Sequence, residues 1–288
     1  MPSFTLSILT DEISHDLAHA LHVAAGEFGL TQVDLRAMWN KNIMRLDAKE
    51  VAEARKLLEK YKLRVAAIAS PLFKSDFPGA PRSEFSPTQR DQFGADFTAD
   101  QQDEVLERAC ELARAFNTTL VRCFDFWRLA DQAPFRTAMD ERLRTAADFA
   151  AKRGVVLAIE NEHTCNSATG SEAARLLGAV KHPALKLTWD PGNAERFGES
   201  AFPTGYSKLP KDRIAHVHCK DLARKDGKLE WEAMGRGVID WAGQFRALTR
   251  DGFKGAATLE THWRGAGTPE ESSRQSLAGL RSLLARAS

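Results

Sequence analysis

The stretch VVLAIE (155–160) opens a series of short apolar runs that each end in a polar residue, and the series continues with LKLTWD (185–190), IAHVHC (214–219) and GAATLE (255–260). Four runs of the same kind precede it, FTLSIL (4–9), QVDLR (32–36), LRVAAIAS (63–70) and TLVRCF (119–124). Several runs are almost continuously apolar, which is typical of strands in a parallel sheet covered on both faces. The sequence therefore predicts eight buried parallel strands.

Amphipathic segments separate these runs. In DAKEVAEARKLLEKY (47–61) apolar residues recur at helical spacing, Asp47 is a predicted N-cap, and Glu50 completes a capping-box spacing. Segments 101–116 and 138–152 carry similar stripes, and the second stops just before Gly154. The runs begin 28, 31, 56, 36, 30, 29 and 41 residues apart, so a unit of one strand and one helix repeats along the chain.

Eight such units in 288 residues predict an α/β protein with a (β/α)8 TIM barrel as its single domain over residues 1–288. An open, doubly wound sheet is the alternative, although no G-x-G-x-x-G motif follows the first strand. The longest interval, after the third strand, holds FKSDFPGAPRSEFSPTQRDQFGAD (73–96), which lacks helical periodicity. We expect this long loop to lie over the catalytic face as a lid, with a plain surface insertion as the alternative.

Composition and charge indicate the class of partner. Forty Lys and Arg residues balance 39 Asp and Glu residues, so no basic surplus points to nucleic acid, and a small-molecule partner is favoured. The four cysteines lie far apart without C-x-x-C spacing, which favours buried reduced thiols: Cys110, Cys123, Cys165 and Cys219. The N-terminal residues lack a secretory pattern, and no apolar stretch approaches the roughly 20 residues of a membrane span. We expect a cytoplasmic protein that binds no membrane and that can form homo-oligomers.

The ends of the last four predicted strands carry metal-ligand side chains. In a parallel barrel the carboxyl ends of the strands meet at one mouth, so Glu160, Asp190, His218 and Glu260 are expected to converge there. Three buried carboxylates repel one another unless a cation offsets their charge. Three oxygen ligands and one nitrogen without a thiolate suit one divalent ion, Mn, Mg, Co or Zn. Each residue alone has a structural explanation, as a turn, cap or core residue, but their joint occurrence predicts a metal site.

The order of six motifs resembles the sugar phosphate isomerase/epimerase group of the xylose isomerase-like TIM-barrel superfamily. These motifs are TDEI (10–13), IENEH (159–163), TWDPGNA (188–194), HVHCKD (216–221), GRGVIDW (235–241) and DGFKGAATLE (251–260). The resemblance implies one divalent ion on Glu160, Asp190, His218 and Glu260, with the two glutamates as catalytic acid and base. A metal that chelates a carbonyl and its neighbouring hydroxyl acidifies the adjacent C–H and stabilises an enediolate. Returning the proton to the other face gives epimerisation, and returning it to the neighbouring carbon gives isomerisation.

Departures from the family pattern bear on the substrate. Asn193 stands where family members commonly carry a histidine, and Asn166 and Arg224 retain only half of the pattern of ketose 3-epimerases, so that activity is not favoured. Predicted substrate contacts are Asn193, Lys220, Arg224, Arg236 and His163. Further candidates to line the pocket are Glu162, His262, Arg122, Trp127 and Trp189, with core packing as the alternative for each tryptophan.

The sequence thus predicts a divalent-metal-dependent isomerase or epimerase of a carbohydrate, which can be a sugar, a sugar phosphate or a keto-sugar. A metal-dependent lyase or dehydratase on a keto-inositol or keto-sugar is the alternative, because the same enediolate can expel a leaving group. An endonuclease of the superfamily is less favoured, since that branch takes further zinc ligands from early strands, whereas Arg36 and Ser70 end the second and third runs here. A non-catalytic sugar-binding barrel is also less favoured because all four ligand positions are present.

Overall fold

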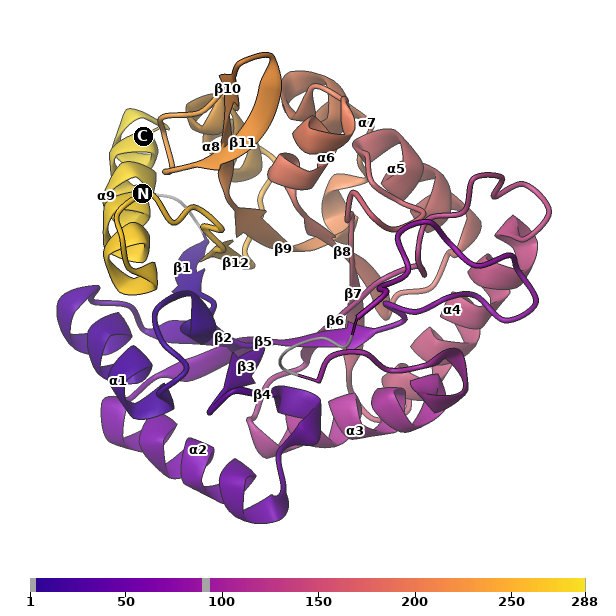
Figure 1. Ribbon diagram of the computed structural model, residues 1–288, viewed down its shortest axis with the longest axis horizontal. Coiled ribbons are helices and arrows are strands. Elements are labelled where there is room, and N and C mark those ends of the chain that lie inside the picture. The colour runs from indigo at the N-terminus through magenta and orange to yellow at the C-terminus, as the bar shows by residue number, and fades with distance from the viewer. Residues whose placement is uncertain (1–3, 90–93, 288) are drawn as a thin grey trace.

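Eight parallel strands form the wall of a barrel in the computed structural model, which describes residues 4–89 and 94–287 (Figure 1). The strands are β1 (Thr5–Ile8), β2 (Gln32–Leu35), β5 (Arg64–Leu72), β6 (Leu120–Cys123), β7 (Val156–Glu160), β8 (Leu185–Trp189), β9 (Ile214–Cys219) and β12 (Ala256–Leu259). They pair in the order β1-β12-β9-β8-β7-β6-β5-β2, and a parallel bridge between Leu9 and Asp34 links the two ends of this order. The predicted (β/α)8 fold is confirmed, and each predicted run coincides with one barrel strand, although β5 continues two residues beyond its run.

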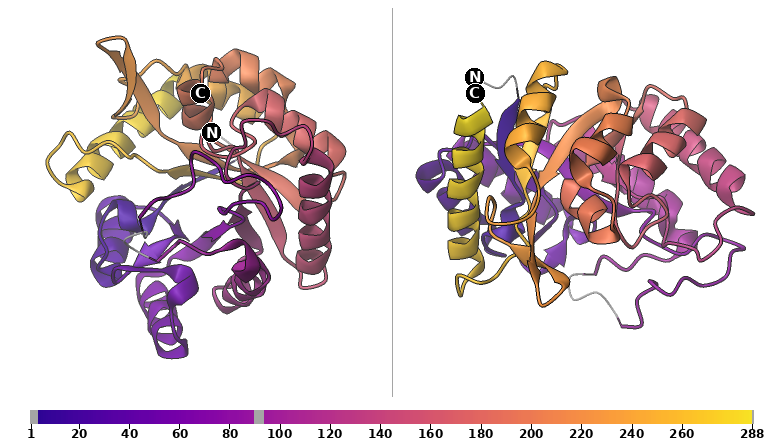
Figure 2. Two further views of the ribbon diagram at one scale, coloured as in Figure 1. Left: turned by 45° about the vertical axis from the view of Figure 1, so that its right-hand side comes forward. Right: turned by 90° about the horizontal axis from the view of Figure 1, so that it is seen from above.

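Helices cover the outside of the strands, as both views of Figure 2 show. They are α1 (Leu17–His22), α2 (Ala48–Tyr61), α3 (Gln102–Ala115), α4 (Arg136–Ala151), α5 (Gly170–Ala179), α6 (Pro191–Phe197), α7 (Tyr206–Lys208), α8 (Trp241–Arg250) and α9 (Pro269–Ala287). The predicted capping box is present at α2, where Asp47 accepts hydrogen bonds from the backbone N–H groups of Lys49 and Glu50. Within the described ranges, no helix is both long and apolar enough to cross a membrane.

Short strands and helical turns lie between the barrel strands and the longer helices. Two antiparallel pairs follow β2 and β9: β3 (Ala37–Met38) with β4 (Lys41–Asn42), and β10 (Asp221–Lys225) with β11 (Lys228–Glu232). Short helical turns complete the chain: η1 (Thr10–Glu12), η2 (Val23–Glu27), η3 (Ile43–Arg45), η4 (Ala99–Gln101), η5 (Ala201–Gly205) and η6 (Lys211–Arg213).

The loop after β5 has its own hydrogen-bond framework in its described part. Asp76 accepts hydrogen bonds from the backbone N–H of Ser83 at 3.1 Å and from the hydroxyl of Ser86 at 2.5 Å. The Ser83 hydroxyl also donates to the carbonyl oxygen of Arg128 at 2.5 Å, which ties the loop to the segment after β6. Residues 90–93 of the predicted lid lie outside the described residues.

Strand alternation separates the core from the barrel interior. Trp189 on β8 is fully buried, and its indole N–H donates to Gln244 of α8 at 3.0 Å, so this side chain packs outward against the helix layer. The next residue, Asp190, belongs to the inward-facing set because successive side chains of a strand point to opposite faces. This alternation directs the polar residue at each strand end to the mouth of the barrel.

Candidate metal centre and substrate cavity

Four side chains from adjacent strands come together at the mouth: Glu160 at the end of β7, Asp190 after β8, His218 near the end of β9, and Glu260 after β12. All four are buried, and one ligand atom of each lies within 4.8 Å of the others. His218 Nδ1 is 3.4 Å from Glu160 Oε1 and 3.2 Å from Glu260 Oε2. We call these four residues the ligand cluster.

Local structure at the start of α6 orients Asp190. One of its oxygens, Oδ1, caps the helix by accepting the backbone N–H of Asn193 at 2.9 Å, and Pro191 follows at the first helical position. Asn161 brackets the same residue, because its side chain accepts the Asp190 N–H at 2.7 Å and donates to the Asp190 carbonyl at 2.8 Å. The second oxygen, Oδ2, faces the cluster, 3.8 Å from His218 Nδ1.

Burial and mutual charge set the protonation of the cluster. Burial opposes ionisation of Glu160, yet the charge of His218 lowers the pKa of this glutamate to about 2. For Glu260, burial is likewise overcome by Lys220, which holds the pKa of that carboxyl well below its usual range. At Asp190 burial prevails and raises the pKa to about 7. Burial opposes protonation of His218, but the two glutamates raise its pKa to about 10. The protein without a metal therefore carries protons that offset part of the clustered negative charge.

A buried ammonium group adjoins the ligand cluster. Lys220 Nζ lies 2.7 Å from Asp190 Oδ2 and 2.9 Å from Glu260 Oε2, and the side chain is only 2% exposed. Despite these contacts, Asp190 Oδ2 and His218 Nδ1 have no partner with hydrogen-bond geometry among the described residues. Buried polar atoms are normally satisfied, so two unsatisfied atoms among three carboxylates and an imidazole fit a divalent cation.

Each glutamate of the cluster is also held by an arginine. The second oxygen of Glu160, Oε2, is 3.1 Å from Arg122 Nη1. The second oxygen of Glu260, Oε1, is 2.6 Å from Arg36 Nη1. One oxygen of each glutamate thus faces the cluster while the other is fixed from outside, which restrains both carboxylates for metal binding.

Arg36 contacts the ligand cluster, and the sequence interpretation did not predict this contact. Besides Glu260, its guanidinium binds Asp11 Oδ2 at 2.7 Å and Glu12 Oε1 at 2.8 Å, so it links three carboxylates. Burial opposes ionisation of Glu12, but the Arg36 charge helps to lower the pKa of this glutamate to about 2. The sequence did contain a signal for this contact. Arg36 is the last residue of the second predicted strand, and every strand end contributes to the mouth.

Three of the predicted substrate contacts lie beside the cluster. Asn193 donates to Glu160 Oε1 at 3.2 Å, and His163 Nδ1 is 3.2 Å from the Asn193 side-chain oxygen. His163 also pairs with Glu162 at 2.7 Å. Lys220 is the third, through the contacts described above. These residues surround the ligand cluster with groups able to donate hydrogen bonds.

The structure does not bring the other two predicted contacts to the mouth. Arg224 lies exposed on β10, where it donates to the Gly227 carbonyl at 3.3 Å. The chain enters the β10–β11 hairpin directly after Lys220, which carries Arg224 away from the barrel. Arg236 is exposed in the loop after β11, and its guanidinium stacks 5.9 Å from the Trp263 ring.

A cavity of about 1000 Å³ opens above the cluster and is lined by Glu160, Glu260 and their two arginines. Glu162, His262 and Trp127 line it as well. Most of the remaining lining comes from residues between 71 and 100, which we call the roof segment. The predicted long loop thus contributes to the wall of the cavity over the mouth of the barrel.

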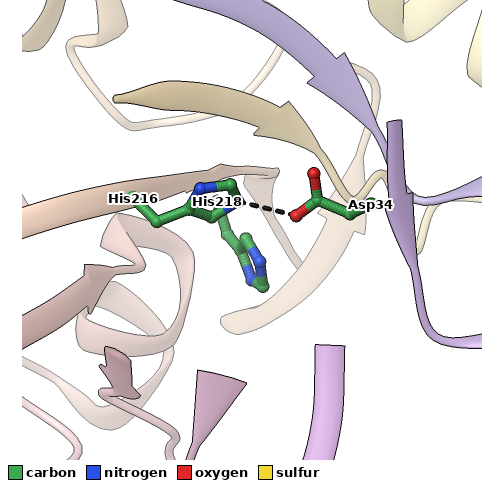
Figure 3. Close-up of side chains that lie close together, drawn as sticks. All are labelled: Asp34, His216 and His218. Carbon is green, nitrogen blue, oxygen red and sulfur yellow. Dashed lines mark hydrogen bonds and ion pairs between the residues drawn. The ribbon is translucent and has the colours of Figure 1, made fainter. Parts of the chain in front are cut away.

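A second buried polar layer lies beneath the cluster. His216 Nε2 binds Asp34 Oδ2 at 2.7 Å, and the Ser7 and Thr258 hydroxyls donate to Asp34 Oδ1 at 2.7 and 3.1 Å. Figure 3 shows the His216–Asp34 contact next to the ring of His218. The His216 and His218 rings meet edge to face, with centroids 5.5 Å apart. This layer supports the cluster from inside the barrel.

Comparisons with known proteins agree with this architecture. Residues 23–283 match the family model described as xylose isomerase-like TIM barrel. No curated protein sequence matches the chain. Among solved structures, the IolI protein with a bound zinc atom is similar at a TM-score of 0.75 and 15% identity, over 99% of each chain.

Two further structures carry enzyme names. The probable 3-DHS dehydratase AsbF from Bacillus anthracis gives a TM-score of 0.72 at 18% identity, over 98% of this chain and 99% of the other. The D-allulose 3-epimerase from Methylomonas sp. gives 0.70 at 19% identity, over 99% of each chain. The chain spans only 42% of a xylose isomerase-like TIM barrel/4-hydroxyphenylpyruvate dioxygenase fusion protein, with 98% of its own length covered at 21% identity and a TM-score of 0.73. At such identities these likenesses concern the fold.

Proposed function

The chain belongs to the xylose isomerase-like TIM barrel family, and on that premise we propose that it is a divalent-metal-dependent isomerase or epimerase of a sugar or related hydroxy-ketone. The observation that carries this proposal is the buried convergence of Glu160, Asp190, His218 and Glu260, of which the two glutamates line a cavity of about 1000 Å³. Three carboxylates and one imidazole would hold Mn, Mg, Co or Zn. When bound, such an ion would polarise a substrate carbonyl and favour loss of the neighbouring C–H proton.

The residues of the chain supply binding and proton transfer in this proposal. Glu160 and Glu260 come from strands on different sides of the cluster, so one carboxylate can take a proton from a substrate carbon and the other can return one. Their second oxygens are held by arginines, and the negative charge that develops on the substrate oxygen lies near the Lys220 ammonium. Asn193 and His163 provide hydrogen bonds for substrate hydroxyls beside Glu160.

A dehydratase or lyase on a keto-inositol or keto-sugar is the second candidate. The specific observation in its favour is Lys220, a buried ammonium within 2.9 Å of Glu260, which can stabilise the charge on a leaving hydroxyl by a charge-assisted hydrogen bond. The likeness to a structure named as a probable dehydratase adds fold-level support.

The two functions differ in their products. The Mn-loaded protein is incubated in D₂O with a ketose and, separately, with a keto-inositol. An isomerase or epimerase incorporates solvent deuterium into its product. Apart from this label the product has the same mass as the substrate, and chromatography and NMR detect both the isomer and the label. Loss of water with a rise in enone absorbance would establish the dehydratase in its place.

Single substitutions test the acid-base assignment. Glu160→Gln and Glu260→Gln are each expected to lower turnover by about 100-fold or more, the usual contribution of a positioned acid or base. Glu230→Gln is the matched control, because this glutamate is exposed on β11. Turnover that survives in both glutamine variants, with metal still bound, contradicts the assignment.

A further inference from the structure

The barrel has a second cavity, of about 930 Å³, at the end where the strands begin. The first residues of several strands line it, among them Thr5, Arg64, Val156 and Ala256. Residues of α2 such as Arg55 and Lys56 extend it outward. We call it the strand-start cavity; it lies at the opposite end of the barrel from the ligand cluster.

The charged residues of this cavity are almost all basic. Among the described residues, five cationic side chains and one carboxylate, that of Glu59, line it; the cations are Arg55, Lys56, Arg64, Lys186 and Lys254. The cavity above the ligand cluster has the opposite composition, with seven acidic and four basic lining residues among those that the structure describes. Because the whole chain is nearly neutral at +1, the basic excess is a local property of the strand-start cavity.

Carboxylates do not neutralise these cations in the described part of the chain. Within residues 4–89 and 94–287, no carboxylate forms an ion pair with Arg55, Lys56, Arg64 or Lys254. Lys186 donates to the backbone carbonyl of Asp212 at 3.3 Å and likewise forms no ion pair with the residues that the structure describes. Like charges gathered in a concave surface without counter-charges produce a positive potential that concentrates anions.

A buried histidine supplies an independent observation. His216 lines the strand-start cavity and is 2% exposed. Its Nε2 is bound by Asp34 at 2.7 Å and lies 2.9 Å from the Thr258 hydroxyl, whereas its Nδ1 has no hydrogen-bond partner among the described residues. A buried ring nitrogen normally has a hydrogen-bond partner. A molecule bound in the cavity would supply this partner to His216 Nδ1, through a hydroxyl or a bridging water.

We propose that the strand-start cavity binds a small phosphorylated molecule, with Arg64 and Lys254 at its mouth as the principal phosphate ligands. Arginine and lysine form charge-assisted hydrogen bonds with phosphate oxygens, and two phosphates can engage several of the five cations together. The volume of about 930 Å³ accommodates a ligand of metabolite size. This proposal is independent of the reaction at the ligand cluster.

Calorimetric titration with pyrophosphate tests the site in the metal-free protein, with EDTA present and ionic strength held constant. We expect saturable binding of one pyrophosphate per chain. The double variant Arg64→Gln/Lys254→Gln should weaken it about tenfold or more, since two charged ligands are lost. Lys228→Gln is the matched control, because Lys228 is an exposed lysine on the β10–β11 hairpin at the other end of the barrel. Thermal melting checks that each variant is folded.

The remaining outcomes overturn the proposal. Absence of pyrophosphate binding, or equal affinity in the double variant and in the control, overturns the proposal. Binding that is lost in Lys74→Gln but kept in the double variant would assign pyrophosphate to the cavity above the ligand cluster, which Lys74 lines. A single-stranded oligonucleotide that binds more tightly than pyrophosphate, and loses affinity in the double variant, would assign the surface to nucleic acid.

Discussion

The affinity of the ligand cluster for a divalent ion should rise steeply with pH. Metal ligands bind as the deprotonated carboxylate and the neutral imidazole, so an ion must displace any proton on Asp190 and on His218. Burial raises the pKa of Asp190 to about 7. The pKa of His218 reaches about 10 because the charges of Glu160 and Glu260 overcome the effect of burial. Both groups therefore hold protons below neutral pH.

The size of the effect follows from these two values. Between pH 6 and pH 8 the deprotonated fraction of Asp190 increases about tenfold, and that of His218 increases about 100-fold. The dissociation constant for Mn²⁺ should therefore fall about 1000-fold over this range, which is about 4 kcal/mol of binding free energy. At pH 7 each bound ion should release more than one proton.

Isothermal titration of Mn²⁺ in buffers with different ionisation enthalpies measures both quantities. In Asp190→Asn one of the two titrating groups is absent, so the slope of log Kd against pH below pH 7 should fall from about two to about one. The metal-free fold should show the opposite trend. Both native-state pKa values lie above the ordinary ones, so the stability that these protons contribute is present at low pH and is lost as pH rises through about 7 for Asp190 and about 10 for His218. A pH-independent Mn²⁺ affinity, or release of less than one proton at pH 7, refutes this reasoning.

Three further substitutions test individual contacts. Arg36→Met leaves the carboxylates bound by its guanidinium without a counter-charge and should lower the free energy of unfolding in urea by about 3–5 kcal/mol; a loss below about 1 kcal/mol would show that these carboxylates take up protons instead. Asp47→Ala removes the cap of α2 and should cost about 1 kcal/mol in the same assay, with Lys49→Ala as the control, and equal effects of the two would discount the cap. Asp221→Ala removes the acceptor for the backbone N–H groups of Gly235 and Gly237, at 3.0 and 3.1 Å, and should cost about 1–3 kcal/mol while speeding proteolysis in 233–239; unchanged cleavage would contradict that anchoring role.

The sequence predicted the barrel well because its signal is local. Continuous apolar runs mark strands that are covered on both faces, and in a parallel barrel the residue at the end of each run has one destination. The convergence of Glu160 and Glu260, 100 positions apart in the printed sequence, follows from strand order alone. The cap at Asp47 was predictable for the same reason, since it depends only on the residues that follow.

Contacts that depend on how the barrel closes were not predictable in this way. Arg36 meets Glu260 because β1, between β2 and β12 in the closed ring, brings their carboxyl ends to one rim, and no local pattern encodes that distance. Arg224 was placed by its spacing from His218, but spacing does not reveal that the chain turns into a hairpin directly after Lys220. Barrel closure decided the first outcome, and the path of the chain after β9 decided the second.

The roof segment also bears on how fast the protein can exchange ligands. It supplies most of the cavity lining. Its two ends are held by several hydrogen bonds, such as Phe73 N–H to Gln102 at 2.6 Å and Gln102 to the Thr98 carbonyl at 3.0 Å. Between these ends, the described residues from 77 to 94 are joined to the rest of the protein by hydrogen bonds from Ser83 to the Arg128 carbonyl at 2.5 Å and from Arg45 to the Gly94 carbonyl at 3.1 Å. A molecule in the cavity is therefore screened from solvent by a segment whose middle part can move after few hydrogen bonds break. We expect product departure, governed by the breaking of these few bonds, to limit the turnover rate, so that catalysis slows in viscous solvent even though no bond of the substrate is affected.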